Sequence, residues 1–397
     1  MKVTNTFNTK LEFKKNITGD YIAGFVQADG SFSAVLTSKT RNSKRYFNIS
    51  LVFTIVQHEK YKDLILEIQK YFKGVGNWYL NKNDKTIRYQ VTKQSDLINV
   101  IIPFFMEHQL RSGKLLSFLH FKYIATVMST RAHWNNKKML LSLIVLASHL
   151  NPLGKIGNKI RYLDPEEQKY VINNIQPEGI DISELTESIK NFKQNELTLE
   201  FIHGLFDGDG NLSIYFVKPS EAKLNRVSSE NQSLEEIKTQ HDYQNETREI
   251  KLYVGYSFTI VQDKHNLSLL NEVKSFFNET GGIYEINDNC SIYKAGSKSI
   301  LASIILPKMA GKTSLDWVDC SQKPVNNDLT SSELNLPLLK YNKIYYSGKI
   351  LKILSNDKII NNENMDQILE LSYYVRDESD NITLEKYIEN FRQKWLL

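Results

Sequence analysis

The hydrophobic pattern of the chain is most distinctive in two similar ten-residue stretches, 21–30 and 201–210. Each stretch is apolar and ends in an aspartate followed by a glycine, Asp29 in the first and Asp209 in the second. Each also carries small residues at i and i+4, which lie on one face of a helix. A glycine within a helix costs about 0.5–1 kcal/mol relative to alanine, so the pattern predicts two helices packed closely through this face. The residues of the face are Gly24, Ala28, Gly204 and Gly208.

A second pattern, the alternation of apolar and polar residues, follows each apolar stretch. Residues 47–55 and 252–260 alternate in this way, which is typical of a strand with one buried and one exposed face. Further elements are expected in the same order in both halves. They are helices at 59–72 and 264–277, short strands at 77–80, 87–92, 283–285 and 291–294, and later helices at 95–108, 114–125 and 298–306.

The two halves also share single residues in a fixed order. Thr18 and Thr198 precede their aspartates by the same number of residues, and both are suited to cap a helix. Gln57 and Gln262 end matching strands, and the pair Gly113-Lys114 in the first half corresponds to Gly311-Lys312 in the second. This conserved order indicates an internal duplication. We therefore predict an α+β fold of two pseudo-symmetric αββαββα repeats, each with an antiparallel sheet that has helices on one face.

The duplication divides the chain into four expected parts. They are a first repeat with its N-terminal lead at 1–125, a helical connection at 126–195, a second repeat at 196–319, and a C-terminal helical extension at 320–397. The connection is too long for a simple loop, and we expect helices at 137–150 and 165–174. The second repeat contains a polar insertion near 218–248, which we interpret as a surface loop because its charges roughly cancel.

Composition excludes several classes of protein. The 397 residues are 41% hydrophobic and 24% charged, which is enough for two buried cores. No apolar run reaches the ~18 residues of a membrane span, so no membrane association is expected. The first six residues lack an apolar signal core, so the protein is expected to act in the compartment where it is made. Cys290 and Cys320 are too few for a zinc site or a disulfide framework.

Charge alone does not establish a partner, because the net charge is only +5. One acid-free loop between two expected strands is a natural place to contact phosphates. Its basic residues are Lys39, Arg41, Lys44 and Arg45.

The expected chemistry lies where the two helices end. A carboxylate is unfavourable at the negative end of a helix dipole, and Asp29 and Asp209 would also repel each other. Divalent cations bound between them would remove both costs, and hard cations such as Mg²⁺ take oxygen ligands. Two-metal sites stabilise the attacking and leaving oxygens in phosphoryl displacement. A pseudo-twofold site also suits a pseudo-twofold substrate such as double-stranded DNA.

Both motifs resemble those of the LAGLIDADG homing endonucleases, in the single-chain form with two motifs. The resemblance covers about 16–125 and 196–319. It implies that Asp29 and Asp209 bind Mg²⁺ or another divalent ion such as Mn²⁺, with the carbonyls of Ala28 and Gly208 as further ligands. The resemblance also assigns polar and basic residues to the site. Gln57 and Gln262 resemble residues that orient water, and Lys114 and Lys312 resemble residues that offset charge in the transition state. Gln27 departs from the family, since many members carry an acid there, as this chain does at Asp207.

The resemblance implies a monomer that hydrolyses both strands of a long, roughly pseudo-palindromic DNA target and leaves short 3′ overhangs, which would promote intron mobility. The two sheets would form a DNA-binding saddle, with polar residues of their open faces reading base edges. The candidates in the first half are Ser33, Lys39, Arg41, Lys44, Arg45, Asn48, Ser50, Arg88 and Gln90. Those in the second half are Ser213, Tyr215, Lys251, Tyr253, Ser257 and Lys294.

The main alternative is a maturase that binds group I intron RNA, with or without residual DNA cleavage. Both aspartates are retained, and an RNA chaperone needs neither. A regulator with an inactive nuclease core conflicts with this pair, and an intein is disfavoured because the chain ends without the splicing His-Asn. The bias toward Asn, Lys, Ile and Tyr suggests an AT-rich genome, which together with the family points to an organelle, a mitochondrion of fungal type.

Overall fold

The computed structural model describes residues 17–41, 44–150, 160–174, 176, 178–217, 252–316, 318, 339–356, 362–376 and 382–395. Their contacts define two compact units. The first consists of Met1–Asp209, Gln262–Val273 and Asn287–Ser291, and the second of Gly210–Val261, Lys274–Ile286 and Ile292–Leu397. The units are therefore discontinuous in sequence and do not follow the predicted boundaries at 125, 195 and 319.

The first unit opens with helix α1 (Gly19–Asp29), and the Oγ of Thr18 accepts the Tyr21 N–H as its N-cap. Four antiparallel strands follow in the spatial order β1-β2-β4-β3. Their bounds are β1 Gly30–Arg41, β2 Lys44–His58, β3 Asn77–Asn81 and β4 Thr86–Val91. Helix α2 (Lys62–Tyr71) connects β2 to β3, as the sequence predicts.

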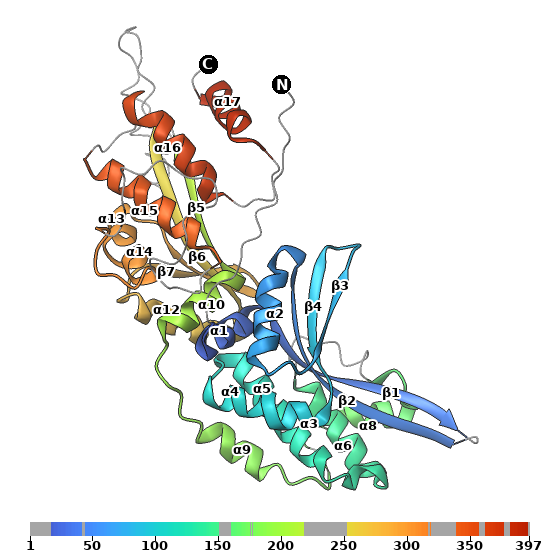
Figure 1. Ribbon diagram of the computed structural model, residues 1–397. Helices are drawn as coiled ribbons and strands as arrows, with labels where there is room; N and C mark the ends of the chain where they lie inside the picture. The colour runs from blue at the N-terminus through green and yellow to red at the C-terminus, as the bar shows by residue number, and fades with distance from the viewer. Residues whose placement is uncertain are drawn as a thin grey trace, which may run out of the picture. The chain divides into compact units, whose positions relative to one another are not determined.

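Helices cover one face of this sheet (Figure 1). They are α3 Gln94–Asp96, α4 Ile102–Glu107 and α5 Ser112–Ser129, with one π turn at Leu97–Ile101. Phe32 of β1 packs against Phe53, Phe105, Phe118 and Phe121, with ring centroids 5.2–5.5 Å apart. The alternation of residues 47–55 follows from this core, because Ile49, Leu51, Phe53 and Ile55 all point into it.

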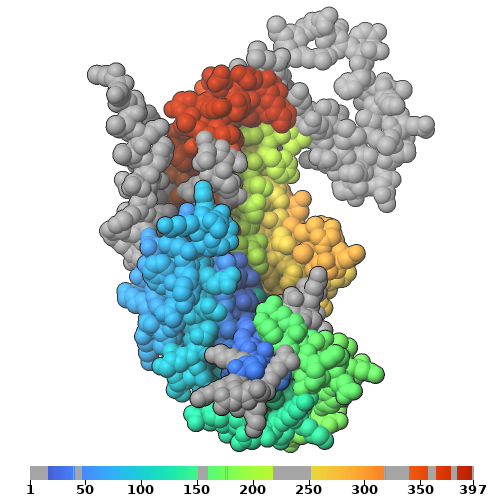
Figure 2. Space-filling model, turned by 90° about the vertical axis from the view of Figure 1, so that its right-hand side faces the viewer, coloured from blue at the N-terminus to red at the C-terminus, as the bar shows by residue number. Residues whose placement is uncertain are grey.

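The connection between the repeats packs on the first repeat. Its helices are α6 Lys137–Ser148, α8 Pro165–Asn173 and α9 Ser183–Lys190. The Ser142 hydroxyl donates to the carbonyl of Glu178, and the Tyr123 hydroxyl of α5 donates to that of Asp181. Figure 2 shows the teal and green surfaces of this segment against the cyan surface of the first repeat. The helices α6 and α8 lie where the sequence predicts them, and α9 is additional.

Segments of the second half complete the first unit. Helix α10 (Leu199–Asp209) packs along α1. A 3₁₀ turn at Lys264–Asn266 and helix α12 (Leu267–Phe276) contact the start of α5 through hydrogen bonds described below.

The second unit has a sheet with the same topology, in the order β5-β6-β8-β7. Its strands are β5 Gly210–Val217, β6 Tyr253–Asp263, β7 Gly282–Asn287 and β8 Cys290–Ala295. Phe258, Phe277 and Tyr293 form its aromatic core. The shorter helices are α13 Lys298–Ile300 and α14 Leu306–Met309, again joined by a π turn, at Leu301–Ile305.

Three further helices of the second unit lie in the predicted C-terminal extension: α15 Tyr341–Asn356, α16 Asn362–Val375 and α17 Leu384–Trp395. Helices α15 and α16 pack on β5, and the ring of Phe391 in α17 lies 4.7 Å from that of Phe216. The helix α15 therefore has the place in its repeat that α5 has in the first.

These features confirm the α+β two-repeat fold. No described helix is both long and apolar enough to cross a membrane. The polar insertion at 218–248 lies outside the described residues, as do Lys251 and Cys320. Cys290 is a free thiol.

Candidate active site at the paired helix ends

The helices α1 and α10 cross at two glycines. A Cβ on Gly24 would lie 2.0 Å from the carbonyl oxygen of Phe201, and a Cβ on Gly204 would lie 2.0 Å from that of Tyr21. Both contacts are with backbone atoms, so no side-chain rotation could relieve them. The small-residue face predicted from the sequence therefore forms the crossing.

The crossing continues to the two aspartates that end the helices. A Cβ on Gly208 would lie 2.2 Å from the Cβ of Ala28 and 2.8 Å from Oδ2 of Asp29. The backbone of α10 thus passes directly beside the carboxylate of α1. Asp29 and Asp209, each the last residue of its helix, are brought to the same end of the helix pair.

Each aspartate accepts a hydrogen bond from a glutamine at the end of a strand. Nε2 of Gln57 donates to Oδ2 of Asp29 at 2.7 Å, and Nε2 of Gln262 donates to Oδ2 of Asp209 at 2.5 Å. Gln262 is buried, whereas Gln57 is half-buried. The structure thus brings together four residues that the sequence predicts for the site.

Lys114 lies at the start of α5, and its ammonium donates to the carbonyl of Gly30 at 2.5 Å. Burial lowers the pKa of Lys114, while the charges of Asp209, Asp263 and Asp29 act in the opposite direction. Both motif aspartates therefore act on this one ammonium. An amine in this place can offset negative charge on a phosphate.

In the second unit the matching contact involves a lysine that the sequence does not single out. The ammonium of Lys340, just before α15, donates to the carbonyl of Gly210 at 2.5 Å. Gly210 follows Asp209 as Gly30 follows Asp29. Lys343 adds a second cation, which donates to Oδ1 of Asn211 at 2.9 Å. Lys312 is exposed in the turn after α14, and its backbone N–H donates to the carbonyl of Pro307.

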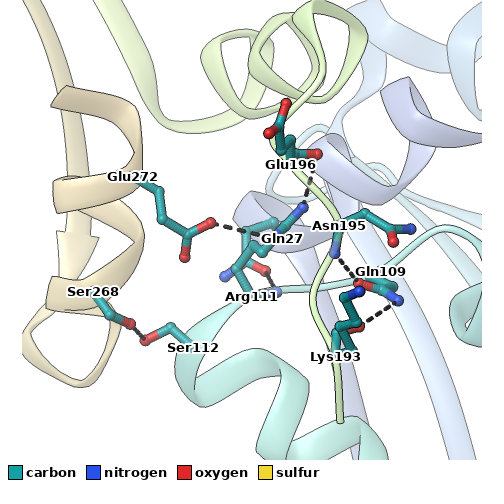
Figure 3. Close-up of polar contacts among 9 residues, drawn as sticks. All are labelled: Gln27, Gln109, Arg111, Ser112, Lys193, Asn195, Glu196, Ser268 and Glu272. Atoms are coloured by element: carbon teal, nitrogen blue, oxygen red, sulfur yellow. Dashed lines mark hydrogen bonds and ion pairs between the residues drawn. The ribbon is translucent and has the colours of Figure 1, made fainter. Parts of the chain in front are cut away.

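The position two residues before each aspartate has a structural partner. Oε1 of Gln27 accepts the backbone N–H of Arg111 at 2.9 Å (Figure 3), and Oδ2 of Asp207 accepts the Tyr21 hydroxyl at 2.8 Å. Burial, and next the charge of Asp207, raise the pKa of Tyr21. Asp207 thus contacts α1 across the helix pair, whereas Gln27 contacts the loop before α5.

Arg111 is another residue that the sequence does not single out. Its guanidinium is 3.2 Å from the carboxylate of Glu272 and donates to the carbonyl of Glu196 at 3.2 Å (Figure 3). Burial lowers the pKa of Arg111 and raises that of Glu272, because it disfavours the charged form of each group. The attraction between the two charges opposes this effect of burial. Nearby, Gln109 donates to the carbonyl of Lys193 and accepts the Asn195 N–H. These contacts hold the loop before α5 to the end of the connection.

The donor set fits a hard divalent cation. Asp29 and Asp209 end the two crossing helices, and the backbone of Gly208 passes beside the Asp29 carboxylate. In the described part of the chain, no group of three or more His, Cys, Asp or Glu residues could hold a metal. A bound ion would therefore complete its shell with backbone carbonyls, water and substrate, as Mg²⁺ commonly does.

Several residues predicted to read DNA lie on the open face of each sheet. In the first sheet, buried Phe32, Ala34 and Leu36 alternate with Ser33 and its neighbours, and Asn48, Ser50, Arg88 and Gln90 share the face of Ser33. Lys39, Arg41, Lys44 and Arg45 lie at the far end of the β1–β2 hairpin, where the pairing is described but the side chains are not.

In the second sheet, Ser213 pairs with Ser257 and Tyr215 with Gly255 on the open face, and Val217 pairs with Tyr253. A Cβ on Gly255 would lie 2.2 Å from the Tyr215 ring, so the ring occupies the space that a side chain at 255 would need. Lys294 is exposed on β8.

Fold and site together define a class: a two-repeat α+β protein whose motif helices cross at glycines and carry paired acids at their ends. Comparisons with known proteins agree. Residues 22–125 match the family model described as LAGLIDADG endonuclease. The probable intron-encoded DNA endonuclease 1 of Mycosarcoma maydis is 25% identical over 293 residues, which cover 74% of this chain and 92% of that relative. The probable intron-encoded endonuclease 2 of Neurospora crassa is 36% identical over 115 residues, which cover 28% of this chain and 25% of that relative.

Solved structures give the same fold. I-SmaMI, bound to its uncleaved DNA target in the presence of calcium ions, superposes with a TM-score of 0.62 at 18% identity, covering 90% of this chain and 98% of that one. The LAGLIDADG homing endonuclease I-GzeII in complex with its DNA target gives 0.60 at 19% identity, covering 90% and 97%. The chain is therefore similar to the LAGLIDADG endonucleases, by the family model over residues 22–125 and by the fold of both repeats.

Proposed function

We propose that this protein is a site-specific homing endonuclease that hydrolyses both strands of a DNA target and so promotes the spread of an intron. The observation that carries the proposal is the pairing of Asp29 and Asp209 at the end of a glycine crossing, each with a glutamine on its carboxylate. This arrangement is costly for folding, because two carboxylates meet at the negative ends of two helices. A catalytic use explains why the chain keeps it.

The roles of the residues follow from their positions. A divalent ion held by the two aspartates, which we propose to be Mg²⁺, would supply Lewis acidity and a more acidic bound water. Gln57 and Gln262 would orient water at the carboxylates they contact. Lys114, and in the second repeat Lys340, would place positive charge beside the phosphates that are cut. The open sheet faces would read base edges in the major groove and would set the target.

We further propose that the enzyme acts as a monomer, leaves short 3′ overhangs, and is encoded by an intron of a mitochondrial genome. The intron-encoded relatives support a mobile-intron origin. Among the described residues, no contact favours intron RNA over DNA as the ligand.

The test uses the full chain and DNA of the intron-less host allele. Wild-type protein with Mg²⁺ should cut both strands, and EDTA should prevent the cut. D29N and D209N should each lower the rate by at least about a hundredfold, because each removes a carboxylate that would hold the divalent ion. D63N, at an exposed acid of α2, serves as the control and should cut normally. No cutting by wild-type protein with Mg²⁺ or Mn²⁺ would refute the proposal.

A further inference from the structure

The two site glutamines are held by different partners. Oε1 of Gln57 accepts the backbone N–H of the next residue, His58, at 2.8 Å. Oε1 of Gln262 instead accepts a hydrogen bond from a side chain, Nδ2 of Asn266, at 3.1 Å. The residue at the corresponding place in the first repeat, four positions after Gln57, is Tyr61. The orientation of the Gln262 amide therefore depends on a residue that has no counterpart in the first repeat.

Asn266 also holds the first turn of α5. Its Oδ1 accepts the backbone N–H of Gly113 at 3.0 Å, and the side chain is buried. Gly113 directly precedes Lys114. A continuous chain of hydrogen bonds thus runs from Asp209 through Gln262 and Asn266 to the turn that carries Lys114, within the first unit.

The backbone before Lys114 is strained and held from the same side. Ser112 has φ of 51°, a left-handed conformation that L-residues rarely adopt. Its hydroxyl donates to the carbonyl of His265 at 2.9 Å and accepts from Ser268 at 2.8 Å, the latter shown in Figure 3. Such strain persists where surrounding contacts over-determine the position, often at functional sites. Residues 265–272 therefore fix where α5 begins.

Hydrogen bonds of Asn266 and Gln262 join the start of α5, which carries Lys114, to the carboxylate of Asp209. Gln262 donates to the same carboxylate. One site therefore combines a lysine of the first repeat with a glutamine of the second, and Asn266 lies between them.

We infer that Asn266 is a positioning residue that assembles this composite site, so that the two DNA strands are cut with unequal dependence on it. The inference rests on the proposed endonuclease function. Without the Asn266 donor, the side-chain amide of Gln262 can rotate. Its oxygen then faces Asp209 in place of its N–H group and repels the Asp209 carboxylate. The Gln57 site keeps its backbone contact and is unaffected.

Two substitutions separate positioning from folding. N266A removes both hydrogen bonds of Asn266. N266D can still accept the Gly113 N–H, so it retains the contact that holds α5, but it cannot donate to Gln262. This variant tests the inference if N266A fails to fold. N271A and N271D are the matched controls, because Asn271 is exposed on α12 and its side chain donates to the carbonyl of Leu267 in its own helix.

The first measurement is cleavage of a duplex labelled on either strand. N266A and N266D should slow the cut of one strand by about ten- to a hundredfold, by analogy with residues that orient metal ligands. The other strand should stay within about threefold of wild type, nicked DNA should accumulate, and the affinity for DNA in Ca²⁺ should not change. Equal slowing of both strands, or wild-type cutting of both, would overturn the inference.

The second measurement needs no metal or DNA. In metal-free protein, the side-chain amide resonance of Gln262 should shift and lose exchange protection in N266A and N266D, but not in N271A or N271D. An unchanged resonance would overturn the inference. If wild-type protein cuts nothing, the proposed function fails, while this measurement still decides whether Asn266 positions Gln262.

Discussion

Lys114 and Lys340 make the same contact in their respective repeats. Each ammonium donates at 2.5 Å to the carbonyl of the glycine that follows a motif aspartate. A lysine tethered in this way keeps its charge next to the chain segment that carries the carboxylate. The shared contact is the reason to assign the second basic role to Lys340.

This assignment predicts that K340A lowers the cleavage rate by about a hundredfold, the usual cost of losing one group that stabilises transition-state charge. K114A should have an effect of similar size. K312A is the control and should cut DNA nearly as wild type does, because Lys312 is exposed in a turn. Single-turnover rates on a labelled duplex measure the effect. A large loss in K312A with none in K340A would contradict the assignment.

The sequence predicts the aspartates and glutamines of the site but not this lysine, for a physical reason. Asp29 and Gln57 belong to a helix and a strand whose patterns repeat in the second half, so their counterparts follow from the patterns. The lysine is defined by a contact between the start of a helix and the start of a strand. In the second half, the corresponding helix is α15. It begins more than twenty residues after Gly311-Lys312, the pair that matches Gly113-Lys114 in sequence. The one available signal is the position of Lys340 just before an apolar helical pattern.

At the scale of the elements, the glycine crossing of α1 and α10 carries both the fold and the chemistry. The helices approach so closely that a methyl group added at Gly204 would clash with the backbone of α1. The atoms nearest to a methyl group added at Gly208 belong to the side chains of Ala28 and Asp29. The two glycines therefore differ in whether the partner helix can compensate for a substitution.

We expect G204A to destabilise the protein by several kcal/mol, within the range known for overpacking and backbone displacement, despite the higher helix propensity of alanine. G208A should also destabilise, but the double variant G208A/A28G should recover much of the loss, because it moves one methyl group from α1 to α10. Urea unfolding measures both effects. Stability of G204A equal to that of wild type would show that the crossing is looser than described.

The structure also shows which elements the sequence could predict. The helices that repeat or carry strong apolar spacing, such as α2 and α6, lie within a few residues of their predicted bounds. The short polar helix α9 is missed, because its apolar residues are too few to give a helical pattern and its position depends on packing against α5. The hydrophobic pattern of a segment predicts a helix when that helix buries one continuous apolar face.

At the scale of the whole molecule, the repeats in the sequence differ from the compact units of the structure. Helix α10 and residues 262–273 belong to the second repeat but pack with the first unit. The crossing with α1 and the hydrogen bonds to Arg111, Ser112 and Gly113 account for this exchange. Such long-range contacts leave no periodic signal in the sequence, so a division at repeat boundaries does not predict them.

The connection between β5 and β6 is where the chain should tolerate the largest change. Val217 and Tyr253 are paired at the ends of these strands, so residues 218–251 join two points that already lie side by side. Replacing them with a four-residue turn rich in glycine and asparagine, with buried Leu252 retained, should preserve the fold. The shorter closed loop should raise the free energy of unfolding by up to about 2 kcal/mol, because loop-closure entropy grows with loop length.

The same deletion tests how the molecule holds DNA. Because the charges of the insertion roughly cancel, it is not expected to contribute strongly to phosphate binding, and the variant should cut its target at close to the wild-type rate. Urea unfolding and single-turnover cleavage on the same preparation separate the two effects. A stable variant that has lost DNA affinity, with a shallower salt dependence of binding, would show instead that the insertion contacts the phosphate backbone.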